Sequence, residues 1–350
     1  MTAAAKRGWL HHLKFPLIAI KIALSFLLFS YVVAKVSPSG LWQTLKPAEP
    51  GLLALAAGIF LASNLIGSWL WARLLHAQGV PIPYAKAASY YFVGLFFNNF
   101  LPSNIGGDIA RITDARKHAD HVSPVFSATL MDRLIGVLAI GLVAVVASAT
   151  VLDHARLYAI YTTTLIVFLV ALGLFLAIFN RGVLEALERP FRWMGARRVA
   201  GGIARLMDDL HGYRNQGGTL AVVFLASMVV QISRILVHYV VGLSLGVRVA
   251  VSYYFLFVPV LAALISLPIS LNGIGVREGA AVVLFQMAGM TRQQSFAIPF
   301  LTYVLSVLIS MLGGLIFVSR PPRRALTRHL ERRRQRKRGT AADREREETI

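Results

Sequence analysis

Long uninterrupted runs of apolar residues dominate the chain, and short polar segments separate them. Six runs reach the length of about 20 residues that a helix needs to cross a hydrocarbon core of about 30 Å. They cover residues 15–34, 52–74, 124–150, 157–179, 219–242 and 295–318. A transmembrane barrel would instead alternate apolar and polar positions in segments of about ten residues. The pattern predicts an all-α polytopic membrane protein with about six full spans.

The first run, residues 15–34, also has the position of a secretory signal sequence. It is longer than the usual apolar region of such a signal, and no small-x-small cleavage site precedes the polar turn at residues 37–40. We therefore expect this run to be retained as the first span.

Two further apolar segments, residues 87–101 and 251–271, predict re-entrant broken helices that return to the side from which they enter. The first would extend about 22 Å as a helix, which is short of the far interface. The second is long enough to cross, but Pro259 and Pro268 interrupt it and only the short run 279–289 follows. A crossing there would place the basic tail outside, against the positive-inside rule.

The overall composition agrees with a membrane protein, because 56% of the residues are hydrophobic and only 15% are charged. The net charge of +20 would indicate nucleic acid in a soluble protein. Here ten Lys and Arg lie in residues 320–338, directly after the last run. Such a tail is typical of a cytoplasmic anchor attracted to anionic lipid headgroups. No nucleic-acid partner is therefore expected.

Metal and disulfide chemistry have no support in the sequence. The chain has no cysteine, and its nine histidines lack the spacing of metal ligands. We expect neither a metal site nor a cofactor.

Basic residues also predict the orientation. Lys6, Arg7 and Lys14 precede the first run and the basic tail follows the last, so both termini are predicted to be cytoplasmic and the number of crossings even. The loops on the outer side then carry few basic residues, namely Lys35, Lys46, Arg156, Arg248, Arg277 and Arg292.

The polar segment 180–218 divides the apolar sequence into two halves. Within it, Ile203, Leu206, Leu210 and Tyr213 recur at helical spacing. This spacing predicts an amphipathic helix on the inner membrane surface, with a tight soluble turn as the alternative. The predicted organisation is an integral membrane domain, 1–320, with repeat one at about 10–150 and repeat two at about 155–320. The basic tail, 321–350, has a composition typical of disorder.

Two polar stretches in the re-entrant segments resemble each other. LPSNIGGDIAR (101–111) and LPISLNGIGVR (267–277) match without gaps at Leu, Pro, one Gly and the final Arg. Each stretch follows two long apolar runs and one short apolar segment, and one long apolar run comes after it. The runs around the second stretch begin on the opposite side of the membrane from those around the first. This order predicts an inverted repeat whose broken helices form a substrate site near the midplane. A chance match is the alternative.

The composition of these stretches has a physical reason. A helix broken inside a membrane leaves backbone N–H and C=O groups unpaired in hydrocarbon, which is costly. Proline ends a helix, glycine permits tight turns, and asparagine amides can pair with the freed groups. The predicted structural hinges are Pro102, Gly106, Gly107, Pro268, Gly273 and Gly275.

Charged residues at membrane depth favour a binding site, because they are expensive there and usually functional. The charged residues within or beside the predicted spans are four arginines and three carboxylates: Arg111, Arg133, Arg234, Arg277, Asp108, Asp132 and Glu278. The one surplus positive charge, together with exposed helix N-termini that attract anions, favours a phosphate-bearing or otherwise anionic headgroup. The predicted substrate-binding residues are Asn98, Asn104, Asp108, Arg111, Arg133, Arg234, Asn272, Arg277 and Glu278. The alternative is a set of local ion pairs that only hold the loops: Asp108 with Arg111, Asp132 with Arg133, and Arg277 with Glu278.

These motifs resemble the lysylphosphatidylglycerol synthase transmembrane-region family, also called flippase-like integral membrane proteins. The matching pieces are NNFLPSNIGGDIAR (98–111), MDRLIG (131–136) and LPISLNGIGVREG (267–279), and the resemblance covers roughly residues 10–320. It implies a bacterial inner-membrane protein that handles lipids, translocating an aminoacylated phospholipid in the best-known members. Those members also carry a soluble aminoacyl-transfer domain, which is not expected in this chain.

The leading hypothesis is a lipid translocase or carrier, not an enzyme, whose partner is a membrane lipid with an anionic or modified headgroup. Asp108 and Glu278 would bind cationic or hydroxyl parts, and Arg111, Arg234 and Arg277 the phosphate. One alternative is an intramembrane transferase that acts on a lipid-linked substrate with Asp108 or Glu278 as general base. Another is a non-catalytic subunit in a hopanoid, glycolipid or aminoacyl-phospholipid pathway, which binds a cytosolic or membrane lipid-synthesis enzyme.

Overall fold

The computed structural model describes residues 38–100, 106–148, 158–180, 197–266 and 273–320, together with Leu27, Ser30, Tyr31 and Gly182. These parts of the chain are helical and contain no strand. The predicted first span, 15–34, and the basic tail, 321–350, lie outside the described residues except for three positions of the first span.

Five long apolar helices coincide with the other five predicted spans, and each is long and apolar enough to cross a membrane. They are α3 (Pro50–Ala77), α6 (Ser123–Ser148), α7 (Tyr158–Ala177), α10 (Gly217–Ser244) and α13 (Arg292–Val318). The prediction of an all-α polytopic membrane protein is confirmed. The helix ends follow local rules: α3 begins with proline in its first turn, and Thr291 caps α13 by accepting a hydrogen bond from the Gln294 amide.

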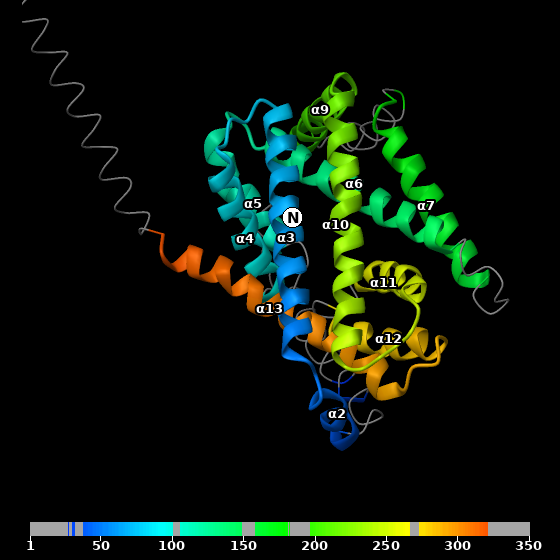
Figure 1. Ribbon diagram of the computed structural model, residues 1–350. Coiled ribbons are helices and arrows are strands. Elements are labelled where there is room, and N and C mark those ends of the chain that lie inside the picture. Colours follow the sequence, from blue (N-terminus) through cyan, green and yellow to red (C-terminus); the bar gives the residue numbers. More distant parts are fainter. Residues whose placement is uncertain are drawn as a thin grey trace, which may run out of the picture.

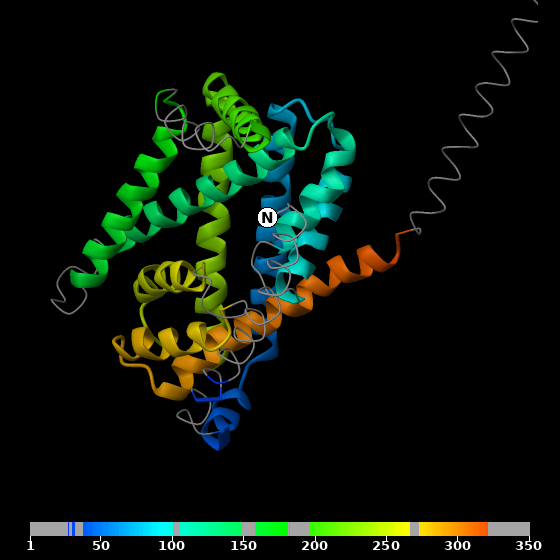
Figure 2. The same ribbon diagram turned by 180° about the vertical axis from the view of Figure 1, so that it is seen from behind.

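Helices α3 and α10 form the centre of the molecule. They lie side by side and run in opposite directions (Figures 1 and 2). A short helix, α2 (Pro38–Leu45), precedes α3 at the lower end of Figure 1. The upper end is covered by α9 (Arg197–Gly212), and the short 3₁₀ helix η4 (Tyr213–Asn215) leads from α9 into α10.

Two helical hairpins flank this central pair at opposite ends (Figures 1 and 2). The first consists of α4 (Tyr84–Phe100) and α5 (Gly106–Ala115), followed by the 3₁₀ helix η1 (Arg116–His118). The second consists of α11 (Val251–Ser266) and α12 (Val276–Gln286). Helices α4 and α11 have 17 and 16 residues, so each extends about 25 Å and is shorter than a hydrocarbon core.

One local prediction is wrong. Pro259 was expected to interrupt the second re-entrant segment, but it lies inside α11, which continues as a helix to Ser266. A proline removes one backbone donor from a helix and does not prevent the surrounding turns from forming in a buried environment. The break follows Ser266, and Pro268 lies outside the described residues.

Each hairpin packs against the last long helix of the other half of the chain. Helix α11 contacts α6, and α4 contacts α13. The second crossing is very close, because a Cβ added at Gly313 would lie 1.9 Å from the carbonyl oxygen of Phe92. Glycine is needed here to let the two backbones approach. The arrangement has the form that an inverted repeat requires, and the repeat itself stays a prediction.

Helix α9 lies within the segment 180–218, where the amphipathic helix was predicted. Its residues Leu206, Met207 and Leu210, with Tyr213 of η4, pack in a core cluster with α3 and α6. The Tyr213 hydroxyl donates to the carbonyl of Leu74 at 2.9 Å. The apolar side of α9 therefore fastens this end of the bundle.

Candidate functional site

A cavity of about 800 Å³ lies between the first hairpin and helices α3, α6, α7, α10 and α11. Its polar wall contains charged and amide side chains, namely Asn98, Asp108, Arg111, Asp132, Arg133, Gln231 and Arg234. The remaining wall is largely apolar and comes mainly from α6, α7 and α11. The cavity thus combines the two kinds of surface that an amphiphile needs.

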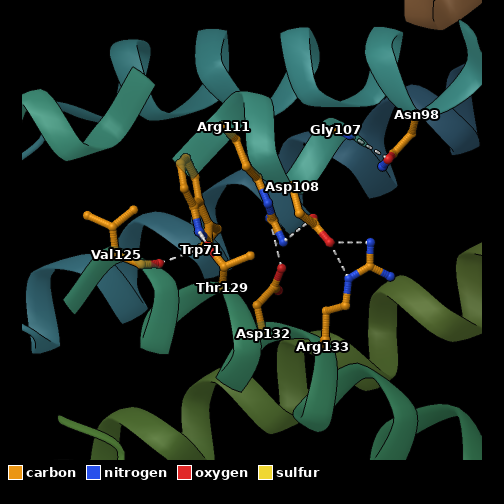
Figure 3. Close-up of polar contacts among 9 residues, drawn as sticks. All are labelled: Trp71, Asn98, Gly107, Asp108, Arg111, Val125, Thr129, Asp132 and Arg133. Atoms are coloured by element: carbon orange, nitrogen blue, oxygen red, sulfur yellow. Dashed lines mark hydrogen bonds and ion pairs between the residues drawn. The ribbon is translucent and has the colours of Figure 1, made fainter. Parts of the chain in front are cut away.

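Four charges from α5 and α6 form one network in the polar wall (Figure 3). Arg111 Nη2 lies 3.0 Å from Asp108 Oδ1, and its Nη1 lies 2.9 Å from Asp132 Oδ2. Asp108 Oδ2 accepts a second hydrogen bond from Arg133 Nε at 2.6 Å. The pairs therefore connect two helices and are more than contacts within one loop.

Arg111 is fixed in the network by two carboxylate partners and two aromatic rings. Its side chain is 6% exposed, and its guanidinium lies over the rings of Trp71 and Tyr91, with centroid distances of 5.1 and 5.5 Å. The Trp71 indole donates to Thr129 Oγ1 at 3.1 Å (Figure 3). Because Arg111 has two carboxylate partners and two aromatic faces, it mainly positions the polar wall.

The start of α5 is fixed by a close contact with α4. The Gly107 amide donates to Asn98 Oδ1 at 2.9 Å, and this bond satisfies one of the free donors at the helix N-terminus (Figure 3). A Cβ added at Gly107 would lie 2.0 Å from the Gly94 carbonyl oxygen. Asp108 lies in the first helical turn, where a carboxylate is favoured by the helix dipole. The hairpin thus places Asp108 and Arg111 at the cavity.

Arg234 has a different environment. It is half-buried within α10, and its guanidinium makes no ion pair with any residue in the described part of the chain. The loops 101–105 and 267–272 contain no acidic residue. Beside it, Gln231 donates to the carbonyl of Gly136 at 3.1 Å, which ties α10 to α6. Among the described residues of the cavity wall there are three guanidiniums and two carboxylates, so within this set one positive charge is in surplus.

The apolar wall includes the most exposed helix of the bundle. Helix α7 packs principally on α6, where Phe168 lies against Gly141, and no residue in its apolar window is buried. Val167 and Phe168 of α7 and Pro259 and Val260 of α11 line the cavity. Apolar side chains on this side can contact hydrocarbon chains while the charged wall contacts a headgroup.

The structure brings five predicted binding residues together at the cavity: Asn98, Asp108, Arg111, Arg133 and Arg234. Asn104 and Asn272 lie outside the described residues. Arg277 and Glu278 do not line this cavity. Arg277 Nη2 instead lies 2.6 Å from Glu278 Oε1, and Glu278 Oε2 accepts from the Gly275 amide at 2.7 Å.

Sequence reasoning did not include Trp71, Tyr91 and Gln231 among the binding-site residues. Aromatic residues are common in membrane helices, so nothing in the sequence marks Trp71 and Tyr91 as a platform for arginine. Asp132 was recognised as a charge but omitted from the binding set, because its partner Arg111 becomes visible only in the fold.

The glycines predicted as hinges have two different roles. Gly273 and Gly275 have φ angles of 76° and 83°, which side chains rarely adopt, so they turn the chain into α12. Gly107 lies inside α5 and permits the close approach to α4. Gly106 begins α5 and is buried, while Pro102 and Pro268 are outside the described residues.

A second ion-pair cluster joins the end of α13 to the first hairpin. Arg320 is paired with Asp114 of α5, lies over the ring of Tyr90 at 5.2 Å and donates to the Ser89 hydroxyl at 3.2 Å. Lys117 lies 2.8 Å from the other Asp114 oxygen. Burial raises the pKa of Asp114, but the hydrogen bonds from Lys117 and Arg320 outweigh burial and hold this pKa below its ordinary value.

Replacing Asp114 by Asn is expected to destabilise this junction by about 1.5–3 kcal/mol, the usual value of a hydrogen bond to a charged group. Because the pKa of Asp114 is lower in the folded state, its contribution is present above about pH 4 and is lost as the pH falls through the folded-state pKa. Thermal unfolding in detergent at pH 7 measures the loss. Asp120→Asn, at an exposed position, is the control. Equal unfolding temperatures for the two variants would contradict the prediction.

Taken together, the helices and the cavity define a multi-pass α-helical membrane protein with a charged cavity among its membrane helices. The family model for the lysylphosphatidylglycerol synthase TM region matches residues 18–314, and the chain belongs to this family. It is also similar to UPF0104 membrane protein PH1989 of Pyrococcus horikoshii, with 23% identity over 328 residues that cover 87% of this chain and 96% of the relative. No solved structure matches it.

Proposed function

We propose that this protein is a carrier that binds the anionic headgroup of a membrane lipid in its cavity and moves the lipid between leaflets. The observation that carries the proposal is the surplus positive charge of Arg234 in a cavity whose other wall is apolar. Arginine binds phosphate oxygens through two parallel hydrogen bonds, so a phosphate-bearing headgroup fits this site. The membership of a lipid-related family supports the same substrate class.

In this mechanism, the first hairpin and α6 hold the polar wall, and the acyl chains lie on the side of α7 and α11. Asp108, Arg111, Asp132 and Arg133 neutralise one another to a large extent, so they shape the wall at modest cost. Arg234 then contributes a positive charge, which the negative charge of the bound phosphate neutralises. The reaction is transport without covalent chemistry, and the residues in the wall bind and position the lipid.

The proposal includes an orientation of the protein in the membrane, which the exposed basic side chains indicate. Exposed basic side chains gather on the helix ends and loops around α9, at the upper end of Figure 1: Arg73, Lys86, Arg116, Lys117, Arg205 and Arg214. By the positive-inside rule we propose that this end faces the cytoplasm, and the resemblance to the family implies a bacterial plasma membrane. Both termini would then be cytoplasmic, and the lipid would move between this leaflet and the outer one.

The test is transbilayer movement in vesicles that contain the purified protein. Phosphatidylglycerol and phosphatidylcholine, each labelled on an acyl chain, are followed by reduction of the label in the outer leaflet. We expect phosphatidylglycerol to move at least about tenfold faster than in protein-free vesicles, and faster than phosphatidylcholine, because its headgroup keeps a net negative charge for Arg234. If neither lipid moves faster than in vesicles with an unrelated membrane protein, the carrier function is wrong. Formation of a new lipid product would favour the transferase.

A further inference from the structure

Helix α10 contributes a polar stripe to the cavity wall. Ser227, Gln231 and Arg234 are spaced by four and three residues, so they share one face of the helix, and all three line the cavity. Ser227 and Gln231 are buried, with 5% and 8% of their surfaces exposed. Arg234 is the residue to which the proposed function assigns the phosphate. The stripe therefore places two uncharged polar side chains beside the phosphate site.

Both uncharged side chains keep hydrogen-bonding capacity that the fold does not use. Gln231 Nε2 donates to the Gly136 carbonyl at 3.1 Å, and this bond turns Oε1 away from that carbonyl. Oε1 has no hydrogen-bond partner among the described residues. The Ser227 hydroxyl also lacks one within that part of the chain, whereas Ser244 of the same helix donates to the Val241 carbonyl. Buried polar groups are nearly always hydrogen-bonded, so these two atoms indicate a partner that enters the cavity.

A further acceptor comes from α6. Asp132 Oδ2 lies 2.9 Å from Arg111 Nη1 (Figure 3), and Oδ1 makes no hydrogen bond to a residue in the described ranges. Asp132 lies one turn before Gly136, to which Gln231 is bonded, so α6 and α10 bring both acceptors to the same part of the cavity. The Asp132 side chain is 19% exposed, so a ligand can reach it. These oxygens can bind hydroxyl groups next to a phosphate on Arg234.

The charge of the wall distinguishes between the two kinds of donor that a headgroup can bring. An ammonium group would add a positive charge to a wall whose described residues already hold three guanidiniums and two carboxylates. Hydroxyl groups add no charge. They can donate to Gln231 Oε1 and Asp132 Oδ1, and the Ser227 hydroxyl can donate or accept. A headgroup with an anionic phosphate and neighbouring hydroxyl groups therefore fits both the charge and the free oxygens.

We infer that the cavity selects lipids whose anionic phosphodiester carries a polyol, such as glycerol, and that Ser227, Gln231 and Asp132 recognise its hydroxyl groups. The inference rests on the proposed function and deepens it, because it names the class of headgroup. Arg234 binds the phosphate, and the hydroxyl groups pair with the free oxygens beside it. An anionic phosphodiester without hydroxyl groups would displace water from these oxygens without replacing its hydrogen bonds, and would bind more weakly.

The matched probe is phosphatidylethanol, which has the charge and the phosphodiester of phosphatidylglycerol but no hydroxyl group in its headgroup. With identical acyl chains in detergent, we expect the unaltered protein to bind phosphatidylglycerol at least about tenfold more tightly than phosphatidylethanol. Gln231→Met and Ser227→Ala should each lower this preference by at least about threefold. Gln286→Met, at an exposed position at the end of α12 and outside the cavity, is the control and should keep the preference. A purely structural role of Gln231 would weaken the binding of both lipids equally and leave the preference unchanged.

The outcomes separate this inference from the proposed function. Equal affinities for the two lipids in the unaltered protein, or a preference that either substitution leaves unchanged, overturns polyol recognition. Tighter binding of phosphatidylethanolamine than of phosphatidylglycerol also overturns it, because the free oxygens would then bind an ammonium group. If Gln231→Met does not fold, Ser227→Ala decides alone, since it removes no hydrogen bond between described residues. If phosphatidylglycerol and phosphatidylethanol neither bind nor move across vesicle membranes, the carrier function itself is wrong.

Discussion

Arg234→Gln is expected to weaken binding of phosphatidylglycerol by about 10- to 100-fold. A hydrogen bond to a charged group contributes about 1.5–3 kcal/mol, and each 1.4 kcal/mol is a tenfold change in affinity. Because Arg234 makes no ion pair with the described residues, its replacement leaves no carboxylate unpaired. In the absence of lipid, the variant should therefore be at least as stable as the unaltered protein. Lipid binding and thermal unfolding in detergent measure the two effects.

The control for this change is Arg248→Gln, which removes the same charge from an exposed position after α10. It should bind phosphatidylglycerol with unchanged affinity. Arg234→Lys keeps the charge but loses the planar pair of donors, so an intermediate affinity is expected. Unchanged affinity in Arg234→Gln would show that the surplus charge does not bind the lipid and would remove the observation on which the function rests.

Gly107→Ala is expected to destabilise the protein by about 1–3 kcal/mol or more and to abolish lipid binding. The added methyl group would lie 2.0 Å from the Gly94 carbonyl oxygen and 2.6 Å from Asn98 atoms, so α4 and α5 must separate. Separation breaks the Asn98 cap and displaces Asp108 and Arg111 from Asp132 and Arg133. The unfolding temperature and phosphatidylglycerol affinity in detergent measure both losses.

Gly173→Ala in α7 is the matched control, because a Cβ there has no neighbour within 4 Å. Alanine is the better helix former, so this variant should be as stable as the unaltered protein. A Gly107→Ala protein with normal stability and lipid affinity would mean that the first hairpin tolerates a wider spacing, and that the charge network does not depend on it.

The sequence predicted much of the candidate site because charge is rare at membrane depth. Asp108, Arg111, Arg133 and Arg234 were identified from position alone, and the fold places all of them at one cavity. The sequence predicted less about which of these charged residues form ion pairs with one another. The alternative of local pairs holds for Arg277 with Glu278, but Asp108 and Arg111 also pair across helices with Arg133 and Asp132.

The aromatic platform under Arg111 shows why the rest was not predictable. Trp71 lies forty residues before Arg111 in the chain, and the indole is oriented by its bond to Thr129 on a third helix. No spacing rule relates these positions. Similarly, the Arg320 contact with Asp114 joins residues 206 positions apart, which only the crossing of α13 over α4 brings together.

The sequence by itself determined the helical class, the described spans and the shortness of the two hairpin helices. The reason is that hydrocarbon requires every backbone group to be paired within its own segment, so apolar length alone specifies a membrane helix. Tertiary structure decided which charges meet, which glycine allows two backbones to touch, and that Arg277 lies outside the main cavity. These features depend on distances of a few ångströms between segments distant in the chain, and hydropathy carries no information about such distances.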